Sequence, residues 1–277
     1  MTKRIGFFVY GFVCYALFLV TFLYAIAFVG GFLVPRTLDG AASGPLGAAI
    51  AIDTAVLGIF ALQHSVMARK WFKDRWTRIV SPVVERSTFV LAASLALILL
   101  FSLWRPLGGV VWSVDDPVAR GVLWALFGFG WTLVLVATFL INHFDLFGLR
   151  QVWLSLRGKP YTKLEFGTPG PYRLVRHPLY VGFFFAFWST PHMTYAHLLF
   201  AIATTAYILL AIQFEERDLI RELGPAYQDY RQRVPMVVPF TKLSAKQKLQ
   251  RAGTVALIAF TIKGLMWLAI AGAIVLR

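Results

Sequence analysis

Four side chains of different chemistry lie close together in the segment Asn142–Gln151. The segment carries an amide, an imidazole, a carboxylate and a guanidinium group, at Asn142, His143, Asp145 and Arg150. Such a cluster at the end of an apolar stretch can hold a polar ligand, orient a general base and offset its charge. The alternative is an ordinary interfacial cap, in which Arg150 reaches lipid headgroups.

A second polar segment, Gly170–Gly182, runs into a long apolar stretch. Pro171 and Pro178 each fix φ and push the preceding residue out of the helical region, so we expect Gly170 and His177 to be extended and a helix to begin near Pro178. His177 would then lie at a helix N-terminus, where partial positive charge and free N–H groups suit an anionic or polar ligand. A basic interfacial anchor before a span is the alternative.

Two adjacent carboxylates, Glu215 and Glu216, follow this apolar stretch, which is an unusual position at the exit of a span. A further ionisable pair, Asp53 and His64, lies within an earlier apolar stretch. Their separation is close to a whole number of helical turns, so both should lie on one helix face. Because ionisable groups within spans are costly, each is a candidate site residue. A histidine bonded to a neighbouring helix and a boundary aspartate are the structural alternatives.

The elements that position these residues are predicted to be transmembrane helices. The chain has 277 residues, of which 58% are hydrophobic and 14% charged, whereas soluble domains carry about 25% charged residues. We therefore predict an all-α, polytopic transmembrane bundle. The run from Pro178 to Phe214 is too long for one crossing and contains a turn at Ser189–Thr194, which predicts a helical hairpin. The other predicted spans are 6–34, 44–67, 87–104, 120–142 and 253–276, and the last of these, which contains Lys263, could instead lie against the bundle. Gly128 and Gly130, inside one span, indicate close helix packing.

Basic residues alternate with these spans. The N-terminus and the segments 68–86, 143–177 and 215–252 are rich in Lys and Arg, whereas the intervening loops are poor in them. By the positive-inside rule the basic segments are cytoplasmic. His64, the 142–151 cluster, His177, Tyr180 and the two glutamates then all lie at cytoplasmic helix ends, where they can line one pocket. The net charge of +14 is explained by topology and by membrane lipids as partners, so no nucleic acid is expected.

Two sets of residues resemble known membrane methyltransferases. The segment 168–236 contains Arg-His-Pro-x-Tyr at 176–180 and a later Glu-Glu followed by Gly-x-x-Tyr-x-x-Tyr, and it resembles the cofactor-binding signature of the isoprenylcysteine carboxyl methyltransferase-like enzymes. Gln63-His64-Ser65 together with Asn142–Gln151 is similar to the nurim family, most of all to its bacterial methanethiol S-methyltransferase members. This similarity extends over roughly residues 1–240. It implies S-adenosylmethionine as methyl donor and dimethyl sulfide as product.

The resemblance also implies where the donor binds, across 170–182 and 215–233. Aromatic and imidazole rings there can contact adenosine or the cationic sulfonium group. Glu215 or Glu216 can accept from ribose hydroxyls or from the amino group, and Arg176 can face the donor's carboxylate. The residues expected to bind the cofactor are Tyr172, Arg176, His177, Tyr180, Glu215, Glu216 and Tyr227.

Methyl transfer to sulfur is an in-line displacement, which mainly needs alignment and a supply of thiolate. Because a small alkyl thiol is mostly protonated at neutral pH, a nearby base or cation should help. We predict His143 as the base, oriented by Asp145, with His64 as the second candidate and Arg150 as an electrostatic stabiliser.

The predicted domain organisation is one transmembrane methyltransferase domain, residues 1–252, with an additional hydrophobic helix at 253–277. The predicted location is a bacterial inner membrane, with a small thiol as substrate. Three alternatives stay open: a methyltransferase acting on a prenylated cysteine or a lipid, a non-catalytic nurim-like membrane protein, and a metal or haem protein. No tight spacing such as His-x-x-His supports the last of these.

Overall fold

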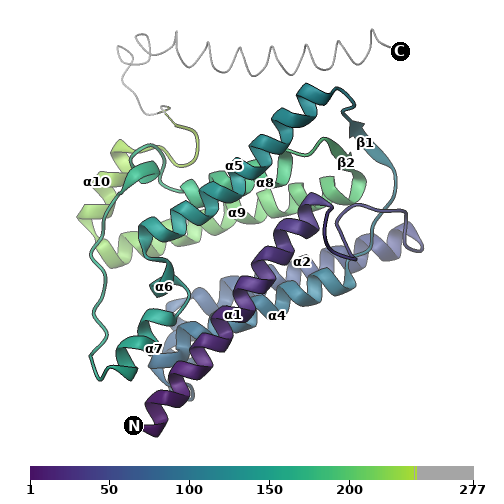
Figure 1. Cartoon of the computed structure of the whole chain (residues 1–277). Helices are drawn as coiled ribbons and strands as arrows, with labels where there is room; N and C mark the ends of the chain where they lie inside the picture. The colour runs from purple at the N-terminus through teal and green to yellow at the C-terminus, as the bar shows by residue number, and fades with distance from the viewer. Residues whose placement is uncertain (240, 242–277) are drawn as a thin grey trace, which may run out of the picture. The chain divides into compact units, whose positions relative to one another are not determined.

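The computed structural model describes residues 1–239 and 241, and most of them are helical (Figure 1). The chain divides into two compact units. The first unit comprises Met1–Gly109, Thr138–Gly167 and Thr194–Tyr207. The second comprises Val110–Ala137, Thr168–Met193 and the chain from Ile208 onward.

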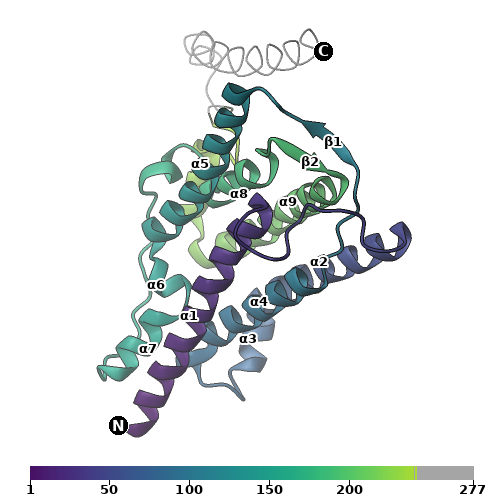
Figure 2. The same ribbon diagram turned by 45° about the vertical axis from the view of Figure 1, so that its right-hand side comes forward.

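Three long apolar helices form the framework of the first unit: α1 (Thr2–Gly30), α2 (Leu46–Ala68) and α4 (Pro82–Leu103). Helix α4 packs against both α1 and α2 (Figures 1 and 2). The rings of Phe28 and Phe101 are 4.8 Å apart, and Trp104 lies edge-on to Phe28. Aromatic side chains of this size supply much of the buried surface in a helical core.

Short helices close one end of the first unit. They are α3 (Lys70–Trp76), α6 (His143–Leu146) and α7 (Leu149–Leu156), and α7 packs against α1 and α4. The residue before α7, Gly148, has φ +87°, and a Cβ there would lie 2.7 Å from the backbone nitrogen of Ser87. Glycine is therefore required for the close approach of this turn to α4.

The second unit contains most of α5 (Pro117–Ile141), the 3₁₀ helix η1 (Gly170–Arg173), α8 (Pro178–Trp188), the later part of α9 (Tyr195–Leu223) and α10 (Pro225–Arg233). Helices α5 and α8 meet at two glycines. A Cβ on Gly130 would lie 2.6 Å from the carbonyl oxygen of Gly182, whereas a Cβ on Gly128 would meet no heavy atom. The prediction of close helix packing is thus confirmed at Gly130 and wrong at Gly128.

Two short strands, β1 (Val110–Ser113) and β2 (His192–Thr194), form a two-stranded sheet that the sequence did not predict. Apart from this sheet, the predicted all-α fold is confirmed. Among the described residues, five helices are long and apolar enough to cross a membrane: α1, α2, α4, α5 and α9. They correspond, with shifted bounds, to the predicted spans at 6–34, 44–67, 87–104 and 120–142 and to the second half of the predicted hairpin. The predicted span at 253–276 lies outside the described residues.

The predicted hairpin is only partly correct. Its turn is present, but α8 has 11 residues and is about 16 Å long, too short for a hydrocarbon core of about 30 Å. Helix α9 continues to Leu223, so Glu215 and Glu216 lie inside this helix and not beyond its end. The residues after Phe214 are mainly good helix formers, so the helix outlasts its apolar part.

Pro171 and Pro178 have different effects on the backbone of the residue that precedes each of them. Helix α8 begins at Pro178, as predicted, and His177 before it has φ −124°, outside the helical region. Gly170 was expected to be extended, but it has φ +52° and begins η1. Because glycine lacks a Cβ, it can satisfy the steric restriction before Pro171 with a positive φ.

The contact between α5 and α8 gives a first prediction. Gly130→Ala should destabilise the protein by about 1–3 kcal/mol, because its methyl group would press on backbone atoms of α8. Gly128→Ala is the matched control and should be neutral or slightly stabilising, since alanine is the better helix former. Unfolding by SDS titration of the purified protein measures both, and equal stability of the two variants would contradict the close packing.

Candidate functional site

Two clusters of polar side chains contain predicted site residues, and one lies in each unit. The carboxylate cluster lies in the second unit and consists of Arg176, His177, Tyr180, Glu215, Glu216 and Arg231. Local backbone structure fixes its first two members. The backbone N–H groups of Arg176 and His177 donate to the carbonyls of Pro235 and Met236, at 2.8 and 3.1 Å. The chain before α8 is therefore tied to the chain that follows α10.

Glu216 is the centre of this cluster. Its Oε1 atom accepts from Nε and Nη2 of Arg176, both at 2.6 Å, and from Nε2 of His177 at 3.1 Å. Its Oε2 atom lies 3.0 Å from Nε of Arg231. The side chain is only 5% exposed. A buried carboxylate with this many charged and hydrogen-bonding partners stays ionised and is held in one orientation.

Arg176 is committed to contacts within the protein. Besides its two bonds to Glu216, its Nη1 atom donates to the carbonyls of Arg231 and Val234, at 3.1 and 2.6 Å. The residue is buried. Its nitrogens thus all donate to protein acceptors, which does not fit the predicted role of facing a donor's carboxylate.

Glu215 differs from its neighbour in exposure. Its side chain is 43% exposed, its Oε2 atom accepts from the hydroxyl of Tyr180 at 2.9 Å, and Nδ1 of His177 is 3.9 Å away. Glu215 therefore presents a carboxylate that is anchored on one side and open on the other.

Three tyrosines surround the cluster. Burial raises the pKa of Tyr230 to about 12 and also raises the pKa values of Tyr172 and Tyr227. The hydroxyl of Tyr230 donates to the carbonyl of Tyr172 at 2.6 Å. These phenols are neutral at physiological pH, and the hydroxyl of Tyr172 also donates, to the carbonyl of Ala137 at 3.4 Å. Tyr227 is only 2% exposed, so a ligand could reach it only from inside the unit.

The histidine cluster lies in the first unit and consists of His143, Tyr15, Thr138 and Phe139. A break in the helix places it. Helix α5 ends at Ile141, and Asn142 has φ +135°, a region that side chains other than glycine rarely adopt. The Oδ1 atom of Asn142 accepts from the backbone N–H of Asp145 at 3.1 Å and so caps α6. His143 is therefore the first residue of a new helix.

His143 is buried and held at both ring nitrogens. Its Nε2 atom lies 2.9 Å from the hydroxyl of Tyr15, and its Nδ1 atom lies 2.9 Å from the hydroxyl of Thr138. Phe139 stacks on the imidazole, with ring centroids 4.2 Å apart. Burial lowers the pKa of His143 below its ordinary value of 6.5. At neutral pH the imidazole is uncharged and can accept a proton.

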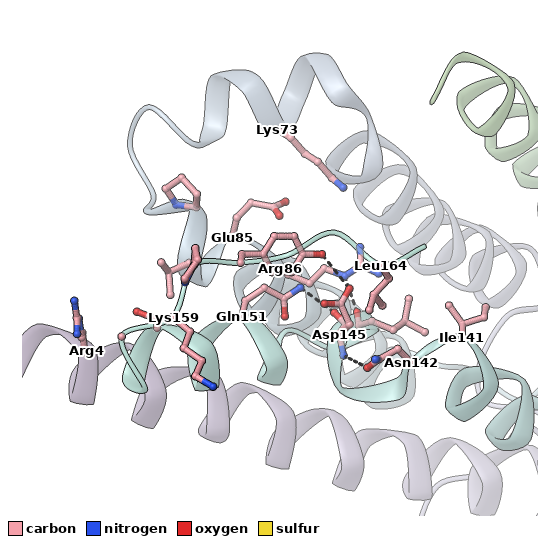
Figure 3. A pocket seen from close by; sticks show the side chains of 17 residues that line it. Arg4, Lys73, Glu85, Arg86, Ile141, Asn142, Asp145, Gln151, Lys159 and Leu164 are labelled. Atoms are coloured by element: carbon pink, nitrogen blue, oxygen red, sulfur yellow. Dashed lines mark hydrogen bonds between the residues drawn. The ribbon is translucent and has the colours of Figure 1, made fainter. Parts of the chain in front are cut away.

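The prediction that Asp145 orients His143 is wrong, because Tyr15 and Thr138 occupy both ring nitrogens. Asp145 instead pairs with Nη1 of Arg150 at 2.9 Å and accepts from the hydroxyl of Tyr161 at 3.3 Å. Gln151 donates to the backbone carbonyl of Asp145 (Figure 3). Arg150 also donates to Thr162. Asp145 and Arg150 therefore tie the loop after α7 to α6.

His64, the second candidate base, also lies in the first unit, between Phe60 and Phe89. The ring centroids are 5.4 and 5.0 Å from that of His64. Its Nδ1 atom is buried and has no hydrogen-bond partner among the described residues. Asp53, predicted to share its helix face, accepts from the backbone N–H of Arg105 at 2.8 Å and is fully buried. This contact agrees with the alternative in which Asp53 has a structural role and is not a site residue.

Sequence reasoning missed Tyr15, Thr138 and Arg231. Tyr15 and Thr138 lie within spans, where a hydroxyl group is itself a signal because it needs a partner. Arg231 adjoins Tyr230 on α10 and lies in the segment 215–233, where the donor was expected to bind, but it was not singled out as a site residue. For the metal alternative, the described part of the chain has no group of three or more His, Cys, Asp or Glu side chains that could hold an ion.

The fold and the two clusters define the class: this is a multi-pass helical membrane protein with two partly buried clusters of polar side chains. No family model and no solved structure matches the chain. It is 56% identical to the methanethiol S-methyltransferase of Mycobacterium tuberculosis over 238 residues, which cover 86% of this chain and 98% of the relative. It is 55% identical to that of Crocosphaera subtropica over 83% of this chain and 91% of the relative.

The chain therefore belongs to the methanethiol S-methyltransferase family. A more distant relative is Nurim of Rattus norvegicus, 32% identical over 62% of this chain and 68% of that protein. The resemblance to the nurim family and its methanethiol S-methyltransferase members, drawn from Gln63-His64-Ser65 and the 142–151 segment, is thus confirmed.

The contrast between the two glutamates gives a second prediction. Glu216→Gln should cost about 3–5 kcal/mol of stability, because it leaves two guanidinium groups without their buried counter-ion. Glu215→Gln is the matched control and should cost less than about 1 kcal/mol, because its carboxylate is half-exposed and an amide oxygen can still accept from Tyr180. SDS unfolding of both variants measures the difference, and a smaller loss for Glu216→Gln would contradict its central position.

Proposed function

We propose that this protein transfers a methyl group from S-adenosylmethionine to methanethiol. The observation that carries the proposal is the 56% identity to a methanethiol S-methyltransferase over 98% of that relative's length. When bound, S-adenosylmethionine supplies an electrophilic methyl group, which the thiol sulfur takes up as it loses its proton, so that dimethyl sulfide and S-adenosylhomocysteine are formed. The residues of the protein then have two tasks: to hold the donor and to take the proton.

The carboxylate cluster has the chemistry to hold the donor. S-adenosylmethionine carries a sulfonium and an ammonium group, and Glu215 offers a half-exposed carboxylate fixed by Tyr180. The rings of Tyr180 and His177 are neighbours, with centroids 5.6 Å apart, and can contact a cation or the adenine. Glu215, Tyr180, His177 and Tyr172 are therefore the residues we propose to contact the donor.

Glu216 and Arg176 act as positioning residues in this proposal. Both are buried, and the bonds between them fix the start of α8 against α9. Because His177 also donates to Glu216, its ring orientation depends on the same carboxylate. Tyr227 packs beside Tyr230, with ring centroids 5.8 Å apart. We propose that the ring of Tyr227 forms part of the wall of the donor site.

His143 is the proposed base. Its imidazole is neutral, but both nitrogens are bonded to hydroxyl groups. A proton can therefore reach Nε2 only through the hydroxyl of Tyr15 or after this hydroxyl turns away. Tyr15 thus becomes part of the proton path, while Asp145 and Arg150 hold the surrounding loop. His64 is the second candidate, because its Nδ1 atom has no partner within the described chain.

The proposed location is a bacterial inner membrane, with the basic segments on the cytoplasmic side. This rests on the alternation of Lys- and Arg-rich segments with Lys- and Arg-poor loops. A cytoplasmic donor site would give direct access to soluble S-adenosylmethionine.

Calorimetric binding of S-adenosylmethionine to the detergent-purified protein, followed by headspace detection of dimethyl sulfide after methanethiol is added, tests the function. We expect binding and product. Glu215→Gln should weaken donor binding about tenfold, as expected for losing one charged contact of about 1.4 kcal/mol, whereas Asp229→Asn on α10 is the matched control and should bind normally. Binding without dimethyl sulfide would redirect the search to prenyl or lipid acceptors, and the absence of binding would favour a non-catalytic protein.

The pH dependence of the rate tests the base. Only neutral His143 can accept a proton, and burial keeps its pKa below 6.5. The rate should therefore be independent of this group above pH 7 and should fall as the pH drops below 6.5. His143→Ala should lower kcat by about 100-fold or more and remove this acid limb.

Tyr15→Phe should lower kcat by about tenfold or more, because it removes the hydroxyl on Nε2. Tyr24→Phe on the same helix is the control and should stay within about twofold. Unchanged rates and pH profiles in both His143→Ala and Tyr15→Phe would exclude His143 and direct attention to His64.

A further inference from the structure

A cavity of about 740 Å³ in the first unit has no role in the proposed reaction. It lies where the beginnings of α1 and α4 meet α6, α7 and the loop that follows α7 (Figure 3). Its charged lining consists of four cations and two carboxylates: Arg4, Lys73, Arg86, Lys159, Glu85 and Asp145. One of these carboxylates, Asp145, is already paired with Arg150. The cavity therefore has an excess of positive charge.

Arg86 is held at one end and open at the other. Its Nε atom donates to the carbonyl of Leu146 at 2.6 Å, and its guanidinium lies 4.9 Å from the ring centroid of Phe89. Within the described chain, its Nη1 and Nη2 atoms make no hydrogen bond. A fixed guanidinium with free terminal nitrogens is well suited to bind the oxygens of an anion.

Two further cations that line the cavity, Arg4 and Lys159, also have charged groups available for a ligand. Among residues 1–239, the side chains of Arg4 and Lys159 form no ion pair or hydrogen bond. Arg4 lies at the turn before Lys159, since a Cβ on Gly158 would be 2.9 Å from its Nη1 atom. Three basic groups from three separate segments thus line one cavity, and none of them forms a salt bridge with a carboxylate of the described residues, although Glu85 and Asp145 interact electrostatically with Arg86.

A buried acceptor adds a further requirement. The Nε2 atom of Gln151 donates to the backbone of Asp145, but its Oε1 atom is buried and has no hydrogen-bond partner in the described part of the protein. Gln151 lines the cavity (Figure 3). A buried acceptor of this kind is costly unless it is satisfied. A ligand with anionic oxygens and one hydroxyl group would meet both the cations and this oxygen.

Neither reactant of the proposed reaction fits this cavity. Methanethiol is small and apolar, and it gains nothing from a lining of charged groups. S-adenosylmethionine carries a net positive charge at neutral pH, so the excess of cations would repel it.

We propose that this cavity binds a phosphate group that carries or adjoins a hydroxyl. The same chemistry is offered by the headgroup of an anionic phospholipid and by a soluble phosphate. Its place at the ends of the α1 and α4 spans is the depth at which lipid headgroups lie.

Thermal unfolding of the full-length protein tests the proposal with two probes. The first is inorganic phosphate against chloride at equal ionic strength, and the second is micelles doped with phosphatidylglycerol against phosphatidylcholine. At least one anionic probe should raise the unfolding midpoint of the wild-type protein by about 3 °C over its control. A rise with phosphatidylglycerol alone identifies a lipid headgroup, and a rise with phosphate alone identifies a soluble ligand.

A charge-matched pair of double variants locates the effect. Arg4→Gln/Lys159→Gln removes two lining cations and should lose most of the rise. Arg78→Gln/Arg157→Gln removes two exposed cations that do not line the cavity and should keep it. Equal losses in the two double variants, or no rise with either probe in the wild-type protein, would overturn the proposal. The wild-type comparison stands even if a double variant does not fold.

Discussion

The buried ion pairs of Glu216 are the constraint on which the candidate donor site depends. Removing a carboxylate from water costs several kcal/mol, which only well-placed partners offset. Here the adjacent residues Arg176 and His177 and, from α10, Arg231 supply them. Because α9 carries Glu216, the start of α8 and the end of α10 are held against one helix. The same interaction leaves the next carboxylate, Glu215, free to meet a ligand.

The histidine cluster shows the opposite way of managing a polar group in an apolar setting. His143 is buried without a charged partner, so it is kept neutral and its two nitrogens are bonded to uncharged hydroxyl groups. This arrangement avoids the desolvation cost of a charge and preserves a group that can accept a proton. The carboxylate cluster is suited to holding a cationic ligand, and the histidine cluster is suited to proton transfer.

The sequence predicted these elements to different degrees. The start of α8 was predictable because Pro178 acts locally, and the spans were predictable from their apolar length. The end of α9 was not predictable, because its last turns are polar and an apolar-length criterion does not detect them. The partner of His143 was not predictable either. Proximity in sequence suggested Asp145, but the partners are Thr138 on the preceding helix and Tyr15, which is 128 residues away on another helix.

Photochemical crosslinking of radiolabelled S-adenosylmethionine to the purified protein, with the labelled peptides identified by mass spectrometry, tests the central claim most directly. The account predicts that the label falls in the peptides around Tyr172–Tyr180 and around Glu215, and that excess S-adenosylhomocysteine prevents it. A label confined to peptides of α1, α4 or α7 would contradict the assignment of the donor to the carboxylate cluster.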